Sequence, residues 1–243
     1  MICSLILGRQ GSVGFPGKNK HLVRGKPLCW YPMAAAANNE LISHHFISTD
    51  DPELADIGKG FGFNLIERPA SLATSGALGE DAYLHGYQVI RDVFGLSPEL
   101  LVLLFCNAPT VTTEQITAGV HLLHSDEAAD SAVTVSRYNM YSPSRARRIG
   151  HEGNLEPFFP FDPRVENKPI TCDRDSQGDV WFADVALSVI RSRNLDHLAD
   201  GLAPQRWMGR RILPIFNEAG LDVDYEWQLG QVEWWLSRKQ GSM

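Results

Sequence analysis

Cysteine and long apolar runs are both scarce in this chain of 243 residues. The four cysteines show no C-x-x-C spacing, which argues against a zinc or dithiol redox site. No run approaches the roughly 18 apolar residues of a membrane span, and the first residues lack the basic leader of a secretion signal. We therefore expect a cytoplasmic protein with reduced thiols that does not insert into a membrane.

Acidic side chains are absent before Glu40, although the chain carries a net charge of −7. The overall charge argues against binding to nucleic acid or to anionic membranes, because neither polyanion is attracted to the molecule as a whole. The acid-free segment is a local cationic patch, with basic residues at Arg9, Lys18, Lys20, Arg24 and Lys26. A solvated basic face would explain this run as well as an anion-binding site would.

Short apolar runs alternate with segments of helical length. The apolar runs are 2–7, 46–48, 64–66, 100–105 and 132–135, and the helical segments are 32–38, 52–60, 80–94 and 114–123. This alternation predicts an α/β, Rossmann-like fold with a mostly parallel central sheet and helices on both faces. Residues 180–189 predict a further strand, and 225–238 predict a closing helix whose Trp227, Trp234 and Trp235 pack against the core.

Prolines interrupt this pattern between residues 138 and 179, a stretch that is also rich in arginine. We find no internal repeat and no flexible linker elsewhere. We therefore expect one domain over 1–243, with 138–179 as an excursion inserted between two strands of the sheet.

A loop with four glycines and two cations follows the first predicted strand. It reads Gly8-Arg9-Gln10-Gly11-Ser12-Val13-Gly14-Phe15-Pro16-Gly17-Lys18-Asn19. Glycines let backbone N–H groups approach an anion closely, and arginine and lysine add charge-assisted hydrogen bonds to phosphate oxygens. The loop has neither the G-K-[ST] ending of a Walker P-loop nor the dinucleotide fingerprint. A polyphosphate site and a purely structural turn both remain possible for it.

Two carboxylates lie two residues apart in Gly220-Leu221-Asp222-Val223-Asp224-Tyr225. In an extended segment Asp222 and Asp224 point to the same side. Hard oxygen ligands on one side suit Mg²⁺, with triphosphate oxygens and waters completing its shell. A D-x-D pair is also common on protein surfaces.

The glycine-rich loop resembles the first motif of the acylneuraminate cytidylyltransferases, which reads (A/G)-R-x-x-S-K-G-x-P-x-K-N after an apolar strand. The likeness continues in order through Gly25-Lys26-Pro27-Leu28, Ile47-Ser48-Thr49-Asp50-Asp51, Arg68-Pro69-Ala70-Ser71-Leu72-Ala73 and the D-x-D segment. The resemblance implies a Mg²⁺-dependent homodimeric enzyme that transfers CMP from CTP to an acidic 2-keto sugar, of the nonulosonic or Kdo type, and releases pyrophosphate. It also implies that 138–179 is a dimerisation arm that reaches the neighbouring active site.

The site residues that we expect fall into three groups. Catalysis is assigned to Arg9, Lys18, Asp222 and Asp224, the last two also as metal ligands. Nucleotide binding is assigned to Leu7, Gly8, Arg9, Gly11, Ser12, Lys18, Asn19 and Arg68. Acceptor binding is assigned to Asn107, Arg174, Gln177 and Asp179, and further cations of the excursion that could meet an acceptor carboxylate are Arg145, Arg147, Arg148, Arg164 and Lys168.

The sequence departs from the family pattern at two positions. Val13 replaces the lysine that the family carries in the loop, so that Lys20 or Arg24 would have to compensate, or turnover would be slow. Phe105 replaces a glutamine near the sugar, which leaves Asn107 as the amide there. Two alternatives therefore stay open: transfer to a phosphorylated or phosphonate acceptor, and a weakly catalytic nucleotide-binding protein.

Overall fold

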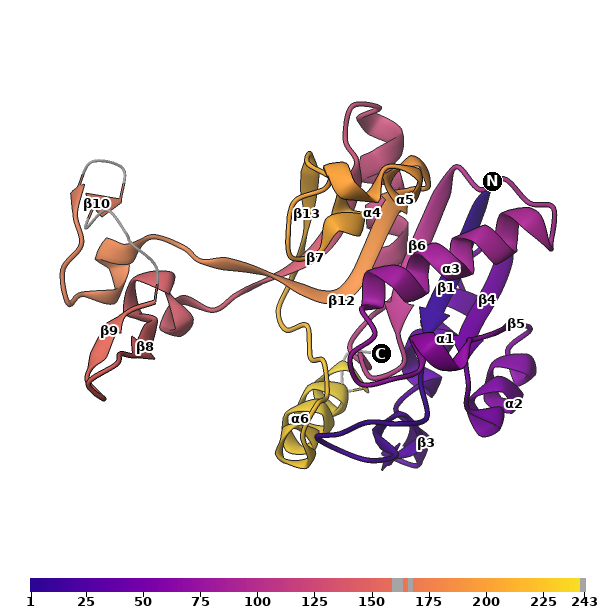
Figure 1. The fold of residues 1–243 in the computed structure, drawn as a ribbon, viewed down its shortest axis with the longest axis horizontal. Coiled ribbons are helices and arrows are strands. Elements are labelled where there is room, and N and C mark those ends of the chain that lie inside the picture. The colour runs from indigo at the N-terminus through magenta and orange to yellow at the C-terminus, as the bar shows by residue number, and fades with distance from the viewer. Residues whose placement is uncertain (159–163, 166–167, 241–243) are drawn as a thin grey trace.

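The computed structural model describes residues 1–158, 164–165 and 168–240, and its centre is a seven-stranded sheet (Figure 1). The strand order is β13-β7-β12-β6-β1-β4-β5. The strands are β1 (Ile2–Leu7), β4 (His44–Thr49), β5 (Asn64–Glu67), β6 (Leu100–Phe105), β7 (Ser131–Arg137), β12 (Trp181–Arg191) and β13 (Ile212–Asn217). Within this sheet only β12 runs antiparallel to its neighbours, β6 and β7. The predicted mostly parallel sheet is confirmed.

Helices cover both faces of the sheet. They are α1 (Trp30–Ala37), α2 (Pro52–Gly60), α3 (Gly79–Asp92), α4 (Thr113–Ser125), α5 (Arg193–Asp196) and α6 (Leu229–Gln240). Short 3₁₀ helices are η1 (Lys18–Lys20), η2 (Ala70–Leu72), η3 (Asn139–Tyr141), η4 (Pro143–Arg145), η5 (Arg174–Gln177), η6 (Leu198–Asp200), η7 (Arg206–Met208) and η8 (Glu226–Gln228). Capping explains where two helices begin: Asp51 accepts from Glu53 N ahead of α2, and Thr112 forms a capping box with Gln115 ahead of α4.

The central strands are buried on both sides, which is why they read as continuous apolar runs. Alternate residues of β1 point to opposite faces. Ile6 packs in one core with side chains of α1, α2 and α4, whereas Leu5 packs in a second core with side chains of α3. A third, smaller cluster holds α6 against Val23 and Leu28, close to the hairpin of β2 (Leu22–Val23) and β3 (Lys26–Pro27).

Three details at the C-terminal end differ from the sequence-based expectations. The edge strand β13 was missed, because its pattern is broken by Pro214. The closing α-helix begins at Leu229, after η8, so that the predicted start at Tyr225 is four residues early. Trp235 is buried as expected, but the packing predicted for Trp227 and Trp234 is wrong, because these side chains are 68% and 60% exposed.

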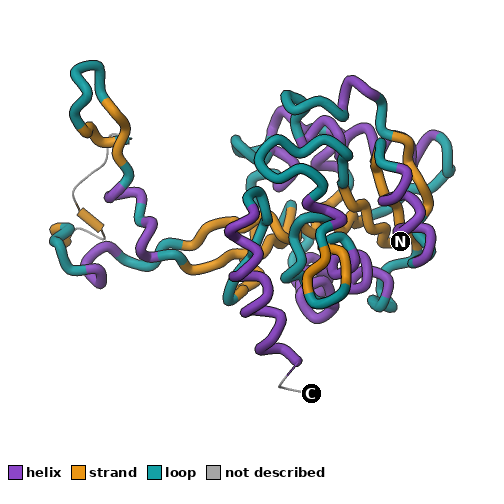
Figure 2. The backbone as a smooth tube through the Cα atoms, turned by 90° about the horizontal axis from the view of Figure 1, so that it is seen from below, coloured by secondary structure: helices purple, strands orange, loops and turns teal. Residues whose placement is uncertain are grey.

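The described residues between β7 and β12 leave the sheet and form a projecting arm (Figures 1 and 2). The arm contains the hairpin of β8 (Arg147–Ile149) and β9 (Leu155–Pro157), and the pair of β10 (Arg164–Val165) and β11 (Lys168–Pro169). Extended chain from β7 and into β12 joins it to the body. No helix among the residues that the structure describes is long and apolar enough to cross a membrane.

Candidate functional site

The glycine-rich loop leaves the carboxyl end of β1 between close neighbours. A Cβ atom on Gly8 would lie 2.6 Å from Cys106 Sγ, so that only glycine fits there. A Cβ atom on Gly14 would lie 2.7 Å from the backbone oxygen of Asp224. The loop therefore passes directly against the D-x-D segment, which is distant in sequence.

Internal hydrogen bonds hold the loop in shape. The buried Asn19 donates from Nδ2 to the backbone oxygen of Arg9 at 3.2 Å, across the base of the loop. Gln10 N donates to Asp50 Oδ1 at 2.9 Å, which joins the loop to the end of β4. These contacts leave the side chains of Arg9, Ser12 and Lys18 beside one pocket.

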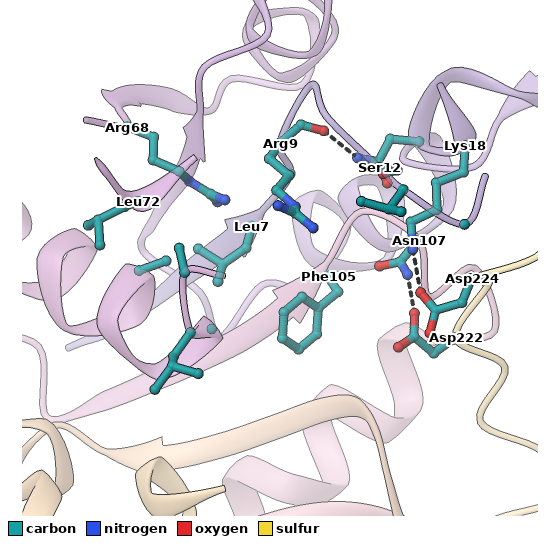
Figure 3. A pocket seen from close by; sticks show the side chains of 18 of the residues that line it. Leu7, Arg9, Ser12, Lys18, Arg68, Leu72, Phe105, Asn107, Asp222 and Asp224 are labelled. Carbon is teal, nitrogen blue, oxygen red and sulfur yellow. Dashed lines mark hydrogen bonds and ion pairs between the residues drawn. The ribbon is translucent and has the colours of Figure 1, made fainter. Parts of the chain in front are cut away.

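This pocket has a volume of about 360 Å³ and lies at the carboxyl ends of β1 and β6. Open α/β sheets bind ligands at this edge. Figure 3 shows Arg68 and Leu72 at one end of the pocket and Lys18, Asp222 and Asp224 at the other. Arg9 and Phe105 lie between the two ends. The pocket therefore combines apolar side chains such as Leu72, beside Arg68, at one end with a cation and two carboxylates at the other.

Arg68 is a buried cation and not the surface residue that its sequence context also allowed. Its Nη2 donates to the backbone oxygen of Ser48 at 2.7 Å and its Nε to Ser48 Oγ at 3.3 Å. Burial lowers the pKa of its guanidinium. Arg9 reaches the same region, because its Nη1 donates to the backbone oxygen of Thr74. Both arginines thus line the pocket beside its apolar side chains.

One carboxylate of the D-x-D segment pairs with a cation of the loop, and the other accepts a hydrogen bond from an amide. Lys18 Nζ lies 2.6 Å from Asp224 Oδ1, and Asn107 Nδ2 donates to Asp222 Oδ1. Burial, with the nearby charge of Asp224, raises the pKa of Asp222 to about 6, while Lys18 opposes the shift. Two carboxylates crowded in this way favour a bound cation.

Most of the predicted site residues meet in this pocket. Its lining includes Leu7, Gly8, Arg9, Ser12, Lys18, Asn19, Arg68, Asn107, Asp222 and Asp224. Gly11 is not part of the lining. Gln177 and Asp179 lie in the arm and are not part of the lining. Gln177 accepts a hydrogen bond from Ser144, and Asp179 accepts one from Asn139. The side chains of Arg174, Arg164 and Lys168 lie outside the described residues.

Sequence reasoning missed much of the apolar end of the pocket. Besides Phe105, the additional lining residues are Val13, Gly14, Leu72, Ala77, Leu78, Gly79, Ala82 and Tyr225. Most belong to the segment between the Arg-Pro-Ala motif and the first turn of α3. This segment directly follows Arg68 in the sequence, and that position could have indicated that it lines the pocket.

Lys20 does not replace the lysine missing at Val13. Its Nζ lies 3.0 Å from Asp51 Oδ2 and 3.1 Å from Glu53 Oε1. Neither Lys20 nor Arg24 lines the pocket, and Val13 is 81% exposed. In the described structure the cations of the pocket are therefore Arg9, Lys18 and Arg68.

Comparison with known proteins bears on the same residues. A family model described as cytidylyltransferase matches residues 3–77, which include the loop and Arg68. The N-acylneuraminate cytidylyltransferase of Escherichia coli O18:K1:H7 is 26% identical over 225 residues, 92% of this chain and 49% of that protein. These matches agree on a cytidylyltransferase sequence for the matched residues of this chain. The resemblance inferred from the motifs is confirmed.

A second relative of this chain is the CMP-N,N'-diacetyllegionaminic acid synthase of Legionella pneumophila subsp. pneumophila. It is 30% identical over 157 residues, which are 63% of this chain and 65% of that protein. The chain spans about half the length of the N-acylneuraminate cytidylyltransferases that it matches in E. coli and Oncorhynchus mykiss, 49% in both cases.

Solved structures share the fold of this chain. A CMP:2-keto-3-deoxy-manno-octonic acid synthetase complexed with CTP superposes with a TM-score of 0.68 at 16% identity, covering 98% of this chain and 99% of that one. A 4-diphosphocytidyl-2C-methyl-D-erythritol synthase from Anaerococcus prevotii gives a TM-score of 0.64 at 11% identity, covering 98% and 96%. At these identities the likeness establishes the fold alone.

Proposed function

We propose that this chain transfers CMP from CTP to the anomeric hydroxyl of an acidic 2-keto sugar, releases pyrophosphate, and requires Mg²⁺. One observation carries the proposal: a single pocket joins a cationic glycine-rich loop to a pair of carboxylates. The names of the relatives in E. coli and L. pneumophila favour cytidylyl transfer to sugars of this class.

Different residues along the pocket would bind different parts of CTP. Arg68 and the apolar residues around Leu72 and Leu78 would hold the nucleoside, while Arg9 and Lys18 would hold the triphosphate through charge-assisted hydrogen bonds. Because the reaction displaces pyrophosphate directly, no covalent enzyme nucleophile is needed. The preorganised cations would stabilise the charge that develops on the α-phosphate.

Asp222 and Asp224 would hold the Mg²⁺ ion. Their oxygens are hard ligands, and burial together with mutual repulsion makes an added positive charge favourable. When bound, the ion would supply charge stabilisation at the phosphates. The described residues bring no third His, Cys, Asp or Glu to the pair, so that nucleotide oxygens and water would complete the shell.

A second candidate reaction differs from the first in its acceptor. Phe105 lines the pocket beside Asn107 and packs edge-on against Tyr83, with ring centroids 5.4 Å apart. An aromatic ring here offers no hydrogen bond to a sugar hydroxyl, which favours an acceptor recognised elsewhere, such as one with a phosphate or phosphonate group.

We further propose that the chain acts as a homodimer through its arm and that it works in the cytoplasm. The hairpin of β8 and β9 exposes Ile149 and Leu155, which oppose each other across the two strands. Apolar side chains on a projecting hairpin have little of their own protomer to pack against. Burial against a second copy would remove them from water.

The test measures pyrophosphate release with CTP, Mg²⁺ and a panel of 2-keto acid sugars, sugar phosphates and phosphonates. Turnover with an acidic sugar that is lost in Asp222→Ala supports the main proposal. Turnover with phosphorylated acceptors alone supports the second. CTP binding without turnover on any acceptor would overturn both and leave a weakly catalytic nucleotide-binding protein, in keeping with the valine at position 13.

A further inference from the structure

Strand β12 contains a β-bulge, and the bulge determines where one carboxylate side chain points. The pairing with β7 passes from Ala183 opposite Val135 to Ser188 opposite Val133, so that residues 184–187 all lie across from Thr134. Val185, inside the bulge, has φ of 51°, in the left-handed region that β-branched residues rarely adopt. Bulges and strained backbone of this kind commonly redirect side chains beside functional sites.

The redirected side chain is Asp184, which is 9% exposed. Its Oδ1 accepts from Thr134 Oγ1 and from Ala186 N, and its Oδ2 accepts from Ser136 Oγ at 2.6 Å and from Asn217 Nδ2 at 3.4 Å. Within the described part of the chain it forms no ion pair. A buried carboxylate without a cation is costly, but each hydrogen bond that it accepts is stronger than one to a neutral group.

These hydrogen bonds lead to the D-x-D segment. Ser136 gives its proton to Asp184, and its oxygen accepts from Gly220 N at 2.9 Å. Gly220 also lies directly on the carboxylate, because a Cβ atom there would be 2.0 Å from Asp184 Cγ. The next anchors follow along the segment: Leu221 N donates to Thr110 Oγ1 at 3.1 Å, and Val223 N donates to Asn107 O at 3.0 Å.

We propose that Asp184 is a positioning residue that sets the backbone from which Asp222 and Asp224 project. It acts through Ser136 and Gly220, since Asp184 itself does not line the pocket. Without Asp184 and Ser136, the backbone at Gly220 would lose the hydrogen bond that holds the start of the D-x-D segment against the sheet. The effect on metal-dependent turnover rests on the proposed function, whereas the effect on the segment does not.

The first experiment measures amide hydrogen exchange over residues 217–225. Ser136→Ala removes the link from Asp184 to Gly220 N and leaves the other partners of Asp184 in place. The matched control is Ser188→Ala, another buried serine of the sheet, whose Oγ accepts from Trp207 Nε1 and does not contact the segment. We expect exchange at Gly220 and Leu221 to be at least about tenfold faster in Ser136→Ala and unchanged in Ser188→Ala. Equal protection in both variants would overturn the proposal.

The second experiment separates positioning from general stability. For Ser136→Ala we expect the Mg²⁺ concentration at half-maximal rate to rise at least about fivefold, with KM for CTP at saturating Mg²⁺ within about twofold of the parent. Asp184→Asn should likewise raise the Mg²⁺ requirement and leave KM for CTP nearly unchanged. Either orientation of the asparagine amide sets its NH₂ group against a hydrogen-bond donor, Ala186 N or Asn217 Nδ2.

The outcomes distinguish the two proposals. A parent protein without turnover on any acceptor would defeat the proposed function, and hydrogen exchange would still decide the role of Asp184. Turnover with an unchanged Mg²⁺ requirement in Ser136→Ala would overturn the positioning role and leave the proposed function intact.

Discussion

The ammonium group of Lys18 and the carboxylate of Asp224 form an ion pair with an Nζ to Oδ1 distance of 2.6 Å, although 206 positions separate them in the chain. The cation of the glycine-rich loop therefore partly neutralises the carboxylate pair. Triphosphate and metal would each compete for one member of this ion pair. The loop and the D-x-D segment are accordingly one electrostatic unit.

Replacing Lys18 by methionine should weaken CTP binding. A charge-assisted hydrogen bond contributes about 1.5–3 kcal/mol, so that Lys18→Met should raise the Kd for CTP by about 10- to 150-fold. Isothermal titration calorimetry with CTP and Mg²⁺ measures this effect. Lys59→Met, an exposed lysine in the last turn of α2, is the control and should bind like the parent. Equal affinities for the two variants would remove Lys18 from the nucleotide site.

Asp222 should make folding stability depend on pH. Its pKa is about 6 in the folded protein against an ordinary 3.8, so that the folded state holds this proton more tightly than the unfolded chain does. The stabilisation is therefore present below about pH 4 and is lost as the pH rises through about 6. Asp222→Asn keeps an oxygen for Asn107 and carries no charge. It should exceed the parent in stability by on the order of 1–3 kcal/mol at about pH 7.5 and match it near pH 4.

Urea unfolding at both pH values checks this prediction. A constant difference between Asp222→Asn and the parent across the range would contradict it. Asp224→Asn serves as a comparison: it removes the neighbouring negative charge but not the burial, so that it should recover only part of the stability.

Two glycines of the loop should differ sharply in tolerance to alanine. A Cβ atom on Gly14 meets the backbone oxygen of Asp224 at 2.7 Å, whereas one on Gly11 meets nothing within 4 Å. Gly14→Ala must therefore push the loop away from the D-x-D segment. We expect kcat/KM to fall at least about tenfold for Gly14→Ala and to stay within about twofold for Gly11→Ala. Comparable losses would show that the Gly11 position serves nucleotide binding in a way that the pocket lining does not reveal.

The arm hairpin should control the oligomeric state. Ile149 and Leu155 are 77% and 70% exposed, and aspartate at both positions would place charge where the proposed interface is apolar. We expect light scattering to give a dimer for the parent and a monomer for the double variant. Leu22→Asp, at a 61% exposed position on β2, should remain dimeric. A monomeric parent would end the arm interpretation.

Local pattern sufficed for the elements around the site. The bounds of β1, β6 and α2 follow from apolar runs, capping and helical length, because these depend on residues that are near each other in the chain. The loop motif also predicted phosphate binding at the end of β1, and that assignment stays a prediction. The family motifs added Arg68 and the carboxylate pair as members of the same site.

Long-range packing decided the rest. Gly14 against Asp224, Lys20 bound by Asp51, and the exposed Trp234 all depend on which distant segments meet, and that is set by how the helices cover the sheet. The bulge that turns Asp184 toward Gly220 leaves no periodic signal, since it breaks the alternation on which strand prediction relies. Most residues of the pocket could be named from the sequence, but the pocket itself exists only where β1, β6 and the D-x-D segment converge.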